Sequence, residues 1–123
     1  MPKKKILIVD DEIELVDLVK IRLEARGYDV VTANSGLEGL SKAAREQPDL
    51  IILDIAMAEM DGYSTLQKIR CDETLKETPV IMLTAYAQMK SLFEMEGISD
   101  YIVKPFDAHD FVSRVENVLK KGK

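Results

Sequence analysis

The sequence contains little of what secreted, membrane-spanning and nucleic-acid-binding proteins require. Cys71 is the only cysteine among 123 residues, so no disulfide can form within the chain, and we predict a reducing, cytoplasmic location. No apolar run approaches the roughly 20 residues that cross a bilayer, and the basic N-terminus leads into a short strand rather than a signal peptide. The net charge of -5 disfavours contact with nucleic-acid phosphates. We therefore predict neither a membrane nor a direct nucleic-acid partner.

The remaining composition is typical of one folded domain. A chain of this length can bury a single hydrophobic core, and a content of 46% hydrophobic and 32% charged residues is typical of globular proteins. No repeat, linker or second hydrophobic core interrupts the pattern. We predict one domain over residues 1–123.

Short apolar runs alternate with amphipathic segments along the chain. The runs are rich in Ile, Leu and Val and predict strands over residues 5–9, 29–33, 50–53, 80–83 and 101–103. The segments between them predict helices ending near residue 26 and over about 36–47, 63–70, 87–96 and 108–120. Connections this short permit only right-handed crossovers between parallel strands. The sequence therefore predicts an α/β fold, a three-layer sandwich of five parallel strands and five helices.

The first helix carries an apolar stripe that we expect to pack on the sheet, formed by Leu15, Val16, Val19 and Leu23. Ile13 and Ile21 fall outside this stripe. They form either an exposed docking surface beside the acidic turn or the ragged edge of a wide stripe. At two other helices the sequence predicts N-terminal caps, a capping box of Ser35 with Glu38 and a single cap at Asp107.

Polar side chains follow four of the five predicted strands. Asp10 and Asp11 follow the first strand, Asp54 the third, Thr84 the fourth and Lys104 the fifth. In an open parallel sheet these ends share one edge, outside which ligands bind. Each residue alone has an ordinary structural explanation, as a helix cap, a turn former, a backbone-bonded hydroxyl or a solvated ammonium. Their joint placement favours a functional site.

The chemistry of this set favours phosphoryl transfer assisted by a metal ion. Two carboxylates about 4 Å apart repel by ~4 kcal/mol at an effective dielectric constant near 20, so three need compensation. Carboxylate oxygens are hard ligands that suit Mg²⁺, for which Mn²⁺ can substitute. An Asp carboxylate can act as the nucleophile and form an acyl phosphate. The Thr84 hydroxyl and the Lys104 ammonium could then contact the phosphoryl oxygens.

These residues carry a family resemblance. The motifs are Asp10-Asp11 after Ile-Leu-Ile-Val, Asp54 in Leu-Asp-Ile-Ala-Met-Ala-Glu-Met-Asp-Gly, Thr84-Ala85 and Lys104-Pro105-Phe106. Together they resemble the receiver domain of two-component response regulators. The resemblance implies a flavodoxin-like doubly wound sheet with strand order 2-1-3-4-5, the order known for the chemotaxis member of the family.

The resemblance also implies a function. By it, Asp54 is the phosphoacceptor, Asp11 a direct Mg²⁺ ligand, Asp10 a ligand through water, and the backbone carbonyl of Ala56 completes the protein ligands. The donor is a histidine kinase or a histidine phosphotransfer protein. We expect a stand-alone receiver without an output domain, a monomer or weak homodimer that binds a downstream protein target. It is a phosphoacceptor in a phosphorelay rather than an enzyme.

The resemblance further implies a switch. Phosphorylation of Asp54 would pull the Thr84 hydroxyl inward, and Tyr101 would rotate into the space behind it. The alternative is a half-buried Tyr101 that never moves. Ala56 and Tyr86 occupy positions that tune hydrolysis of the acyl phosphate. Because the Ala56 side chain cannot orient a water molecule, we predict a long-lived phosphoryl group. The Lys104-Pro105 sequence resembles the cis peptide of the family.

Two departures from the family pattern bear on these expectations. Proline is common in the family at the place of Ala58, and only 19 residues separate Thr84 from Lys104, slightly fewer than usual. The fourth helix or its flanking loops must therefore be shorter. Three alternatives remain, a haloacid-dehalogenase-like phosphatase, a flavodoxin-like electron carrier and a non-phosphorylated scaffold of the same fold. The phosphatase needs an Asp-x-Asp motif where this chain has Asp-Asp-Glu, and the electron carrier needs a loop that receives phosphate.

Overall fold

Five parallel strands form one sheet in the order β2-β1-β3-β4-β5 in the computed structural model, which describes residues 3–56 and 60–121. The strands are β1 (Lys5–Val9), β2 (Asp29–Ala33), β3 (Leu50–Leu53), β4 (Val80–Thr84) and β5 (Asp100–Val103). The predicted strand order is therefore confirmed. Two strands are one residue longer than expected, since Thr84 ends β4 and Asp100 begins β5.

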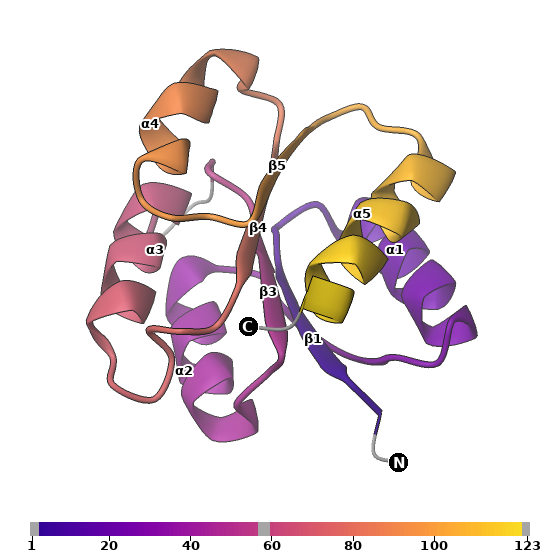
Figure 1. Cartoon of the computed structure of the whole chain (residues 1–123), viewed down its shortest axis with the longest axis horizontal. Coiled ribbons are helices and arrows are strands. Elements are labelled where there is room, and N and C mark those ends of the chain that lie inside the picture. Colours follow the sequence, from indigo (N-terminus) through magenta and orange to yellow (C-terminus); the bar gives the residue numbers. More distant parts are fainter. Residues whose placement is uncertain (1–2, 57–59, 122–123) are drawn as a thin grey trace.

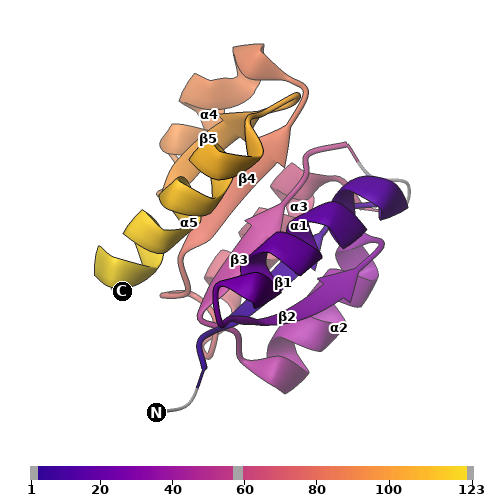
Figure 2. The same ribbon diagram turned by 90° about the vertical axis from the view of Figure 1, so that its right-hand side faces the viewer.

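Helices cover both faces of the sheet, which Figure 1 shows nearly edge-on. They are α1 (Ile13–Ala25), α2 (Gly36–Glu46), α3 (Gly62–Cys71), α4 (Lys90–Glu94) and α5 (Ala108–Lys121). α1 and α5 lie on one face, as Figure 2 shows, and α2, α3 and α4 lie on the other. The predicted flavodoxin-like three-layer sandwich is confirmed. In the described part of the chain, no helix has the length and hydrophobicity that crossing a membrane requires.

Each strand contributes alternate side chains to two separate hydrophobic cores. In β1, Ile6 and Ile8 pack under α1 and α5, whereas Leu7 and Val9 pack under α2 and α3. All four side chains are at most 1% exposed. Burial on both faces explains why the strand sequence is an unbroken apolar run rather than an alternating one.

The apolar stripe of α1 is narrower than predicted. Val16, Val19 and Leu23 are buried, but Leu15 is only partly buried at the edge of the core. Ile13 and Ile21, which lie outside the stripe, are 63% and 66% exposed. Of the two interpretations, the structure therefore favours exposed residues over a wide buried stripe. A docking role for them stays a prediction.

Side-chain caps fix the first turns of three helices. The Ser35 hydroxyl accepts a hydrogen bond from the Glu38 N–H at 3.1 Å, and Asp107 accepts one from the Asp110 N–H at 2.9 Å, as predicted. α3 begins at Gly62 rather than at about 63, because Asp61 caps it by accepting from the N–H of Ser64. Asp61 was not predicted as a cap. Ala58, in the loop before it, lies outside the described residues.

The short segment between β4 and β5 differs most from expectation. The predicted helix over 87–96 is instead a 3₁₀ turn, η1 (Ala87–Met89), followed by the five-residue α4. Phe93 anchors α4 in the core. The carboxylate of Glu96 accepts hydrogen bonds from the Tyr63 hydroxyl at 3.0 Å and from the Gln67 amide at 2.8 Å, both on α3. The segment therefore contains only a short α4, and the residues just after α4 are tied to α3 through Glu96.

Candidate functional site

The first residue after each of three strands continues the hydrogen-bonding pattern of the sheet, and this places the predicted site residues at the carboxyl ends of the strands. The N–H of Asp54 donates to the carbonyl of Val9 at the end of β1, at 3.0 Å. The N–H of Asp10 donates to the last carbonyl of β2, and that of Lys104 to the last carbonyl of β4. These bonds fix where each side chain leaves the sheet, so the site is built on rigid strand ends.

Three carboxylates come together at this edge. Asp10, Asp11 and Asp54 each offer an oxygen, and these oxygens lie within 4.8 Å of one another. Asp10 and Asp54 are buried, whereas Asp11 is exposed. Asp10 also accepts a hydrogen bond from the N–H of Glu12 at 2.9 Å. Asp10 therefore caps the start of α1 and belongs to the cluster at the same time.

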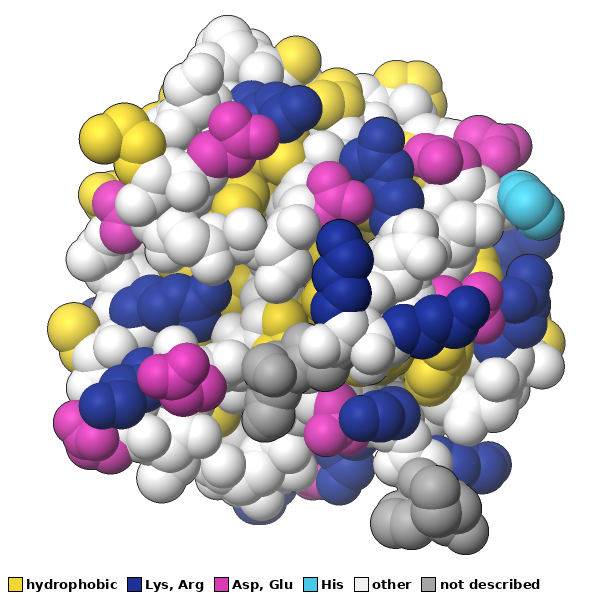
Figure 3. Space-filling model, viewed as in Figure 1, with side chains coloured by type: hydrophobic (Ala, Val, Ile, Leu, Met, Phe, Trp, Pro, Cys, Tyr) yellow, Lys and Arg dark blue, Asp and Glu magenta, His cyan; other side chains and the backbone are white. Residues whose placement is uncertain are grey.

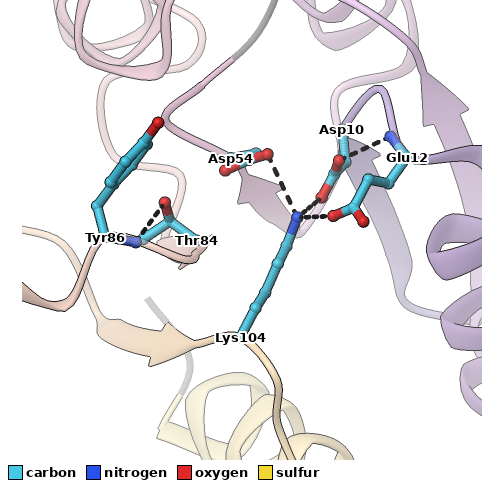
Figure 4. Close-up of polar contacts among 6 residues, drawn as sticks. All are labelled: Asp10, Glu12, Asp54, Thr84, Tyr86 and Lys104. Carbon is cyan, nitrogen blue, oxygen red and sulfur yellow. Dashed lines mark hydrogen bonds and ion pairs between the residues drawn. The ribbon is translucent and has the colours of Figure 1, made fainter.

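Lys104 provides the cation of the site. Figure 4 shows its side chain rising from the end of β5 between Asp54 on one side and Asp10 and Glu12 on the other. The ammonium lies 2.9 Å from Asp10 Oδ2, 2.5 Å from Glu12 Oε1 and 3.3 Å from Asp54 Oδ2. The side chain is only 13% exposed, so these contacts are poorly screened by water. The peptide between Lys104 and Pro105 is cis, as the family resemblance implied.

The charges of the site perturb the two central groups. Burial and the neighbouring charge of Asp10 raise the pKa of Asp54 above its ordinary value, although Lys104 acts in the opposite direction. Burial opposes the charged form of Lys104, but its hydrogen bonds with Asp10 and Glu12 outweigh this effect and raise its pKa. Lys104 is therefore a permanent cation, and Asp54 is a carboxylate whose charge is incompletely compensated.

Thr84 and Tyr101 are connected through the backbone of Tyr86. The Thr84 hydroxyl is fully buried and accepts a hydrogen bond from the Tyr86 N–H at 3.3 Å. The Tyr101 hydroxyl donates to the Tyr86 carbonyl. Tyr101 is 4% exposed, more buried than the half-buried residue of the alternative interpretation. The backbone of one residue, Tyr86, thus lies between the two residues that the resemblance assigns to the switch.

A hollow of about 270 Å³ opens at the strand ends. Its walls include Asp11, Asp54, Ala56, Thr84 and Lys104. All predicted site residues except the buried Asp10 and Tyr101 therefore line one space. Ala56 is exposed there, and its methyl group offers no hydrogen bond to a solvent molecule in the hollow.

Two residues at the site were not predicted. The sequence interpretation placed Glu12 in the acidic turn but gave it no partner, although a carboxylate so near the first strand end could have been paired with Lys104. Gly62 packs against the backbone that carries the acceptor. A Cβ there would contact the Asp54 carbonyl oxygen and would lie 2.6 Å from the Cα of Ile55. The glycine in the Met-Asp-Gly sequence was the only available signal.

Comparisons with known proteins agree with this geometry. The family described as the response regulator receiver domain matches residues 6–116. The chain is 34% identical to a CheY-like response regulator receiver domain protein from Methanospirillum hungatei, with a TM-score of 0.90 over 98% of this chain and 96% of the other. It is 35% identical to the response regulator TrrA from Thermotoga maritima, solved in complex with Mg(2+)-BeF, with a TM-score of 0.84 over 94% and 98% of the two chains.

A curated relative is longer than this chain. RpaA of Synechocystis, a DNA-binding dual master transcriptional regulator, is 41% identical over 119 residues, which are 95% of this chain and 49% of the relative. The chain thus spans about half the length of that relative. Because the family match covers most of the chain and the fold agrees with those of solved members, the chain belongs to the family of response regulator receiver domains.

Proposed function

We propose that Asp54 accepts a phosphoryl group from a phosphohistidine of a histidine kinase or a histidine phosphotransfer protein. In this step an Asp54 carboxylate oxygen forms a bond to phosphorus while the bond between phosphorus and the donor imidazole nitrogen breaks. The imidazole leaves with the bonding electron pair. The observation that carries the proposal is the position of Asp54, which lines an open hollow and lies 3.3 Å from the Lys104 ammonium.

The neighbouring residues have the chemistry that this transfer needs. The Lys104 ammonium can contact a phosphoryl oxygen as a point charge, and the Thr84 hydroxyl can donate to another. The oxygens of Asp10, Asp11 and Asp54 form a hard donor set that fits a divalent cation, with the Ala56 carbonyl as a further ligand. When bound, Mg²⁺ would neutralise charge on the transferring oxygens. We retain Mn²⁺ as a substitute on ligand chemistry alone.

The proposed response to phosphorylation passes through Thr84. An acyl phosphate carries about -1.5 to -2 charges in place of the single charge of the Asp54 carboxylate, so it attracts the Thr84 hydroxyl more strongly. The Thr84 oxygen would then release the N–H of Tyr86, whose carbonyl accepts from Tyr101. Movement of the Tyr86 backbone would link this release to the proposed rotation of Tyr101 and to a change in the surface near α4 and β5.

The chain is a signalling protein by family, and we propose that it acts as a phosphoacceptor without turnover of an external substrate. We retain as proposals a receiver domain over residues 1–123, the cytoplasmic location, a monomer or weak homodimer and a downstream protein target. RpaA is named a DNA-binding regulator, so we limit the expectation of no direct nucleic-acid contact to this chain itself. On the face shown in Figure 3, acidic and basic side chains are mixed.

The test is intact-mass spectrometry after incubation with acetyl phosphate and Mg²⁺. We expect the mass to increase by one phosphoryl group, and we expect omission of Mg²⁺ or prior addition of beryllium fluoride to prevent this increase. The Asp54→Asn variant should not gain mass. The matched control is Asp17→Asn, which removes an exposed carboxylate from α1 and should be phosphorylated like the wild type.

Three outcomes would contradict the proposal. An unchanged mass of the wild type would favour a non-phosphorylated scaffold, and a mass increase retained in Asp54→Asn would place the phosphoryl group elsewhere. Repeated turnover of a generic phosphate ester would favour a haloacid-dehalogenase-like phosphatase, for which no comparison gives support.

A further inference from the structure

The Lys104 ammonium does not lie midway between its carboxylate partners. Its contact with Glu12 Oε1 is the shortest, at 2.5 Å, and its contact with Asp54 Oδ2 is the longest, at 3.3 Å. Figure 4 shows the ammonium directed toward the side of the site formed by Asp10 and Glu12. Without a phosphoryl group, the lysine is therefore shared among three carboxylates, and its contact with the proposed acceptor is the longest of the three.

Glu12 differs from the other two partners in its exposure. The side chain of Glu12 is 58% exposed, against 2% for Asp10 and 7% for Asp54. Asp10 is also held in place by the hydrogen bond that it accepts from the backbone N–H at position 12. A contact with an exposed carboxylate on a flexible side chain can break without opening the core. Glu12 is therefore the partner that Lys104 can exchange most readily for another anion.

Glu12 also stands outside the carboxylate cluster. The oxygens that group within 4.8 Å, among the residues the structure describes, come from Asp10, Asp11 and Asp54. A cation held by that group would leave the Glu12 carboxylate free to keep its contact with Lys104. The remaining competitor for the ammonium is then the phosphoryl group itself, which presents oxygens on the Asp54 side.

We propose that Glu12 is a positioning residue that draws the Lys104 ammonium toward the start of α1, so that a phosphoryl group on the Asp54 side must compete with Glu12 for it. This proposal rests on the proposed function, because it concerns the regulation of the same phosphoryl site. Glu12 thereby lowers the affinity of the empty site for phosphoryl groups and their analogues. Removal of its charge frees Lys104 to bind them.

The contact itself is tested first, without any phosphoryl donor. In protein labelled with nitrogen-15 lysine, the Lys104 ammonium resonance is identified as the one missing from Lys104→Arg. In Glu12→Gln, which keeps the size of the side chain, we expect this resonance to shift and its exchange with water to accelerate at least twofold. The control Glu14→Gln makes the same charge change at an exposed residue in the first turn of α1 and should leave the resonance unchanged.

The consequence is tested by the rate of phosphorylation with acetyl phosphate and by the affinity for beryllium fluoride, both with saturating Mg²⁺. We expect Glu12→Gln to increase both by about two- to fivefold, the range that an exposed ion pair contributes. Glu14→Gln should leave both quantities close to their wild-type values. Glu12→Asp keeps the charge but is one methylene shorter, so it should resemble Glu12→Gln if contact, rather than charge, is responsible.

The outcomes separate this inference from the proposed function. Any of three results would overturn the role of Glu12. These are equal effects of Glu12→Gln and Glu14→Gln, an unshifted Lys104 resonance in Glu12→Gln, and slower phosphorylation of Glu12→Gln. Failure of the wild type to be phosphorylated at Asp54 would instead overturn the proposed function. The lysine resonance can still be measured in that case, because it requires no phosphoryl group.

Discussion

Replacement of Asp54 by Asn should stabilise the metal-free protein. The variant removes one charge from a cluster in which the carboxylate oxygens lie within 4.8 Å of one another. At that distance and an effective dielectric constant of about 20, each pair repels by roughly 3.5 kcal/mol, so neutralising Asp54 relieves about 7 kcal/mol of repulsion by Asp10 and Asp11. Asp11 is exposed, and solvent screening reduces its share.

The same replacement removes an attraction to Lys104. At 3.3 Å this attraction is worth about 5 kcal/mol under the same dielectric constant. The net electrostatic gain is therefore at most about 2 kcal/mol, because screening weakens the repulsion by Asp11. Relief of the burial of a charged Asp54, the first cause of its raised pKa, adds to this gain with the same sign. The raised pKa of Asp54, caused first by burial and then by Asp10, agrees with this direction.

The stabilisation should depend on pH. The pKa of Asp54 is higher in the folded than in the unfolded protein. Below the unfolded pKa, Asp54 therefore does not reduce the stability of the wild type, but the wild type loses free energy of unfolding as the pH rises through the folded pKa and Asp54 ionises. Asn does not titrate. The difference between variant and wild type should therefore be largest near pH 7 and should close as the pH falls through the folded pKa, which lies above the ordinary value of 3.8.

Thermal unfolding followed by circular dichroism, in EDTA, measures the effect. For a chain of this size a gain of 2 kcal/mol corresponds to an increase of roughly 8 °C in Tm. The control Asp17→Asn, at an exposed site on α1, should change Tm by no more than about 2 °C. An Asp54→Asn protein with a Tm at pH 7 equal to or below that of the wild type would refute the reasoning, because the Lys104 attraction would then outweigh repulsion and burial together.

Three further perturbations have defined outcomes. Lys104→Ala leaves buried carboxylates without their cation and should lower the free energy of unfolding by about 3–5 kcal/mol, partly restored by Mg²⁺; an unchanged urea midpoint contradicts this. Gly62→Ala forces the backbone of Asp54 and Ile55 to move, so stability should fall by about 1–3 kcal/mol and phosphorylation should slow, whereas wild-type values in both assays would exclude close packing there. Ala56→Asn provides a group that can orient water, so its phosphoryl group should decay faster than that of the wild type; equal lifetimes in a decay assay would reject the hypothesis.

The sequence predicted those features that depend on a strand and its immediate end. The strands are buried on both faces, so Ile6–Val9 and the run before Asp54 appear as continuous apolar segments whose ends are unmistakable. The polar residue after each run is then placed by the sheet itself, which explains why Asp10, Asp54 and Lys104 meet. The strand order did not follow from these patterns and came from the family resemblance.

The features that the sequence missed depend on contacts between distant segments. The pairing of Glu12 with Lys104 joins residues 92 positions apart, so it is indicated only by the sheet edge that both residues adjoin and not by the acidic turn itself. The close approach of Gly62 to the Asp54 backbone depends on the path of the intervening loop. The division of the predicted fourth helix into η1 and the short α4 depends on its remaining length and on the tie between Glu96 and α3. Local propensity cannot report such tertiary effects.

The charge balance of the site connects its instability to its function. Four carboxylates, those of the cluster and Glu12, face one ammonium, so three negative charges remain uncompensated. A divalent cation would leave one negative charge, and the acyl phosphate, which replaces the single charge of the Asp54 carboxylate by up to two, adds about one more. Neither Lys104 nor a metal ion alone can therefore balance the phosphorylated site, and the lysine must be shared between Glu12 and the phosphoryl oxygens. A site neutral in the empty state would fold more stably, but it would attract a divalent cation less.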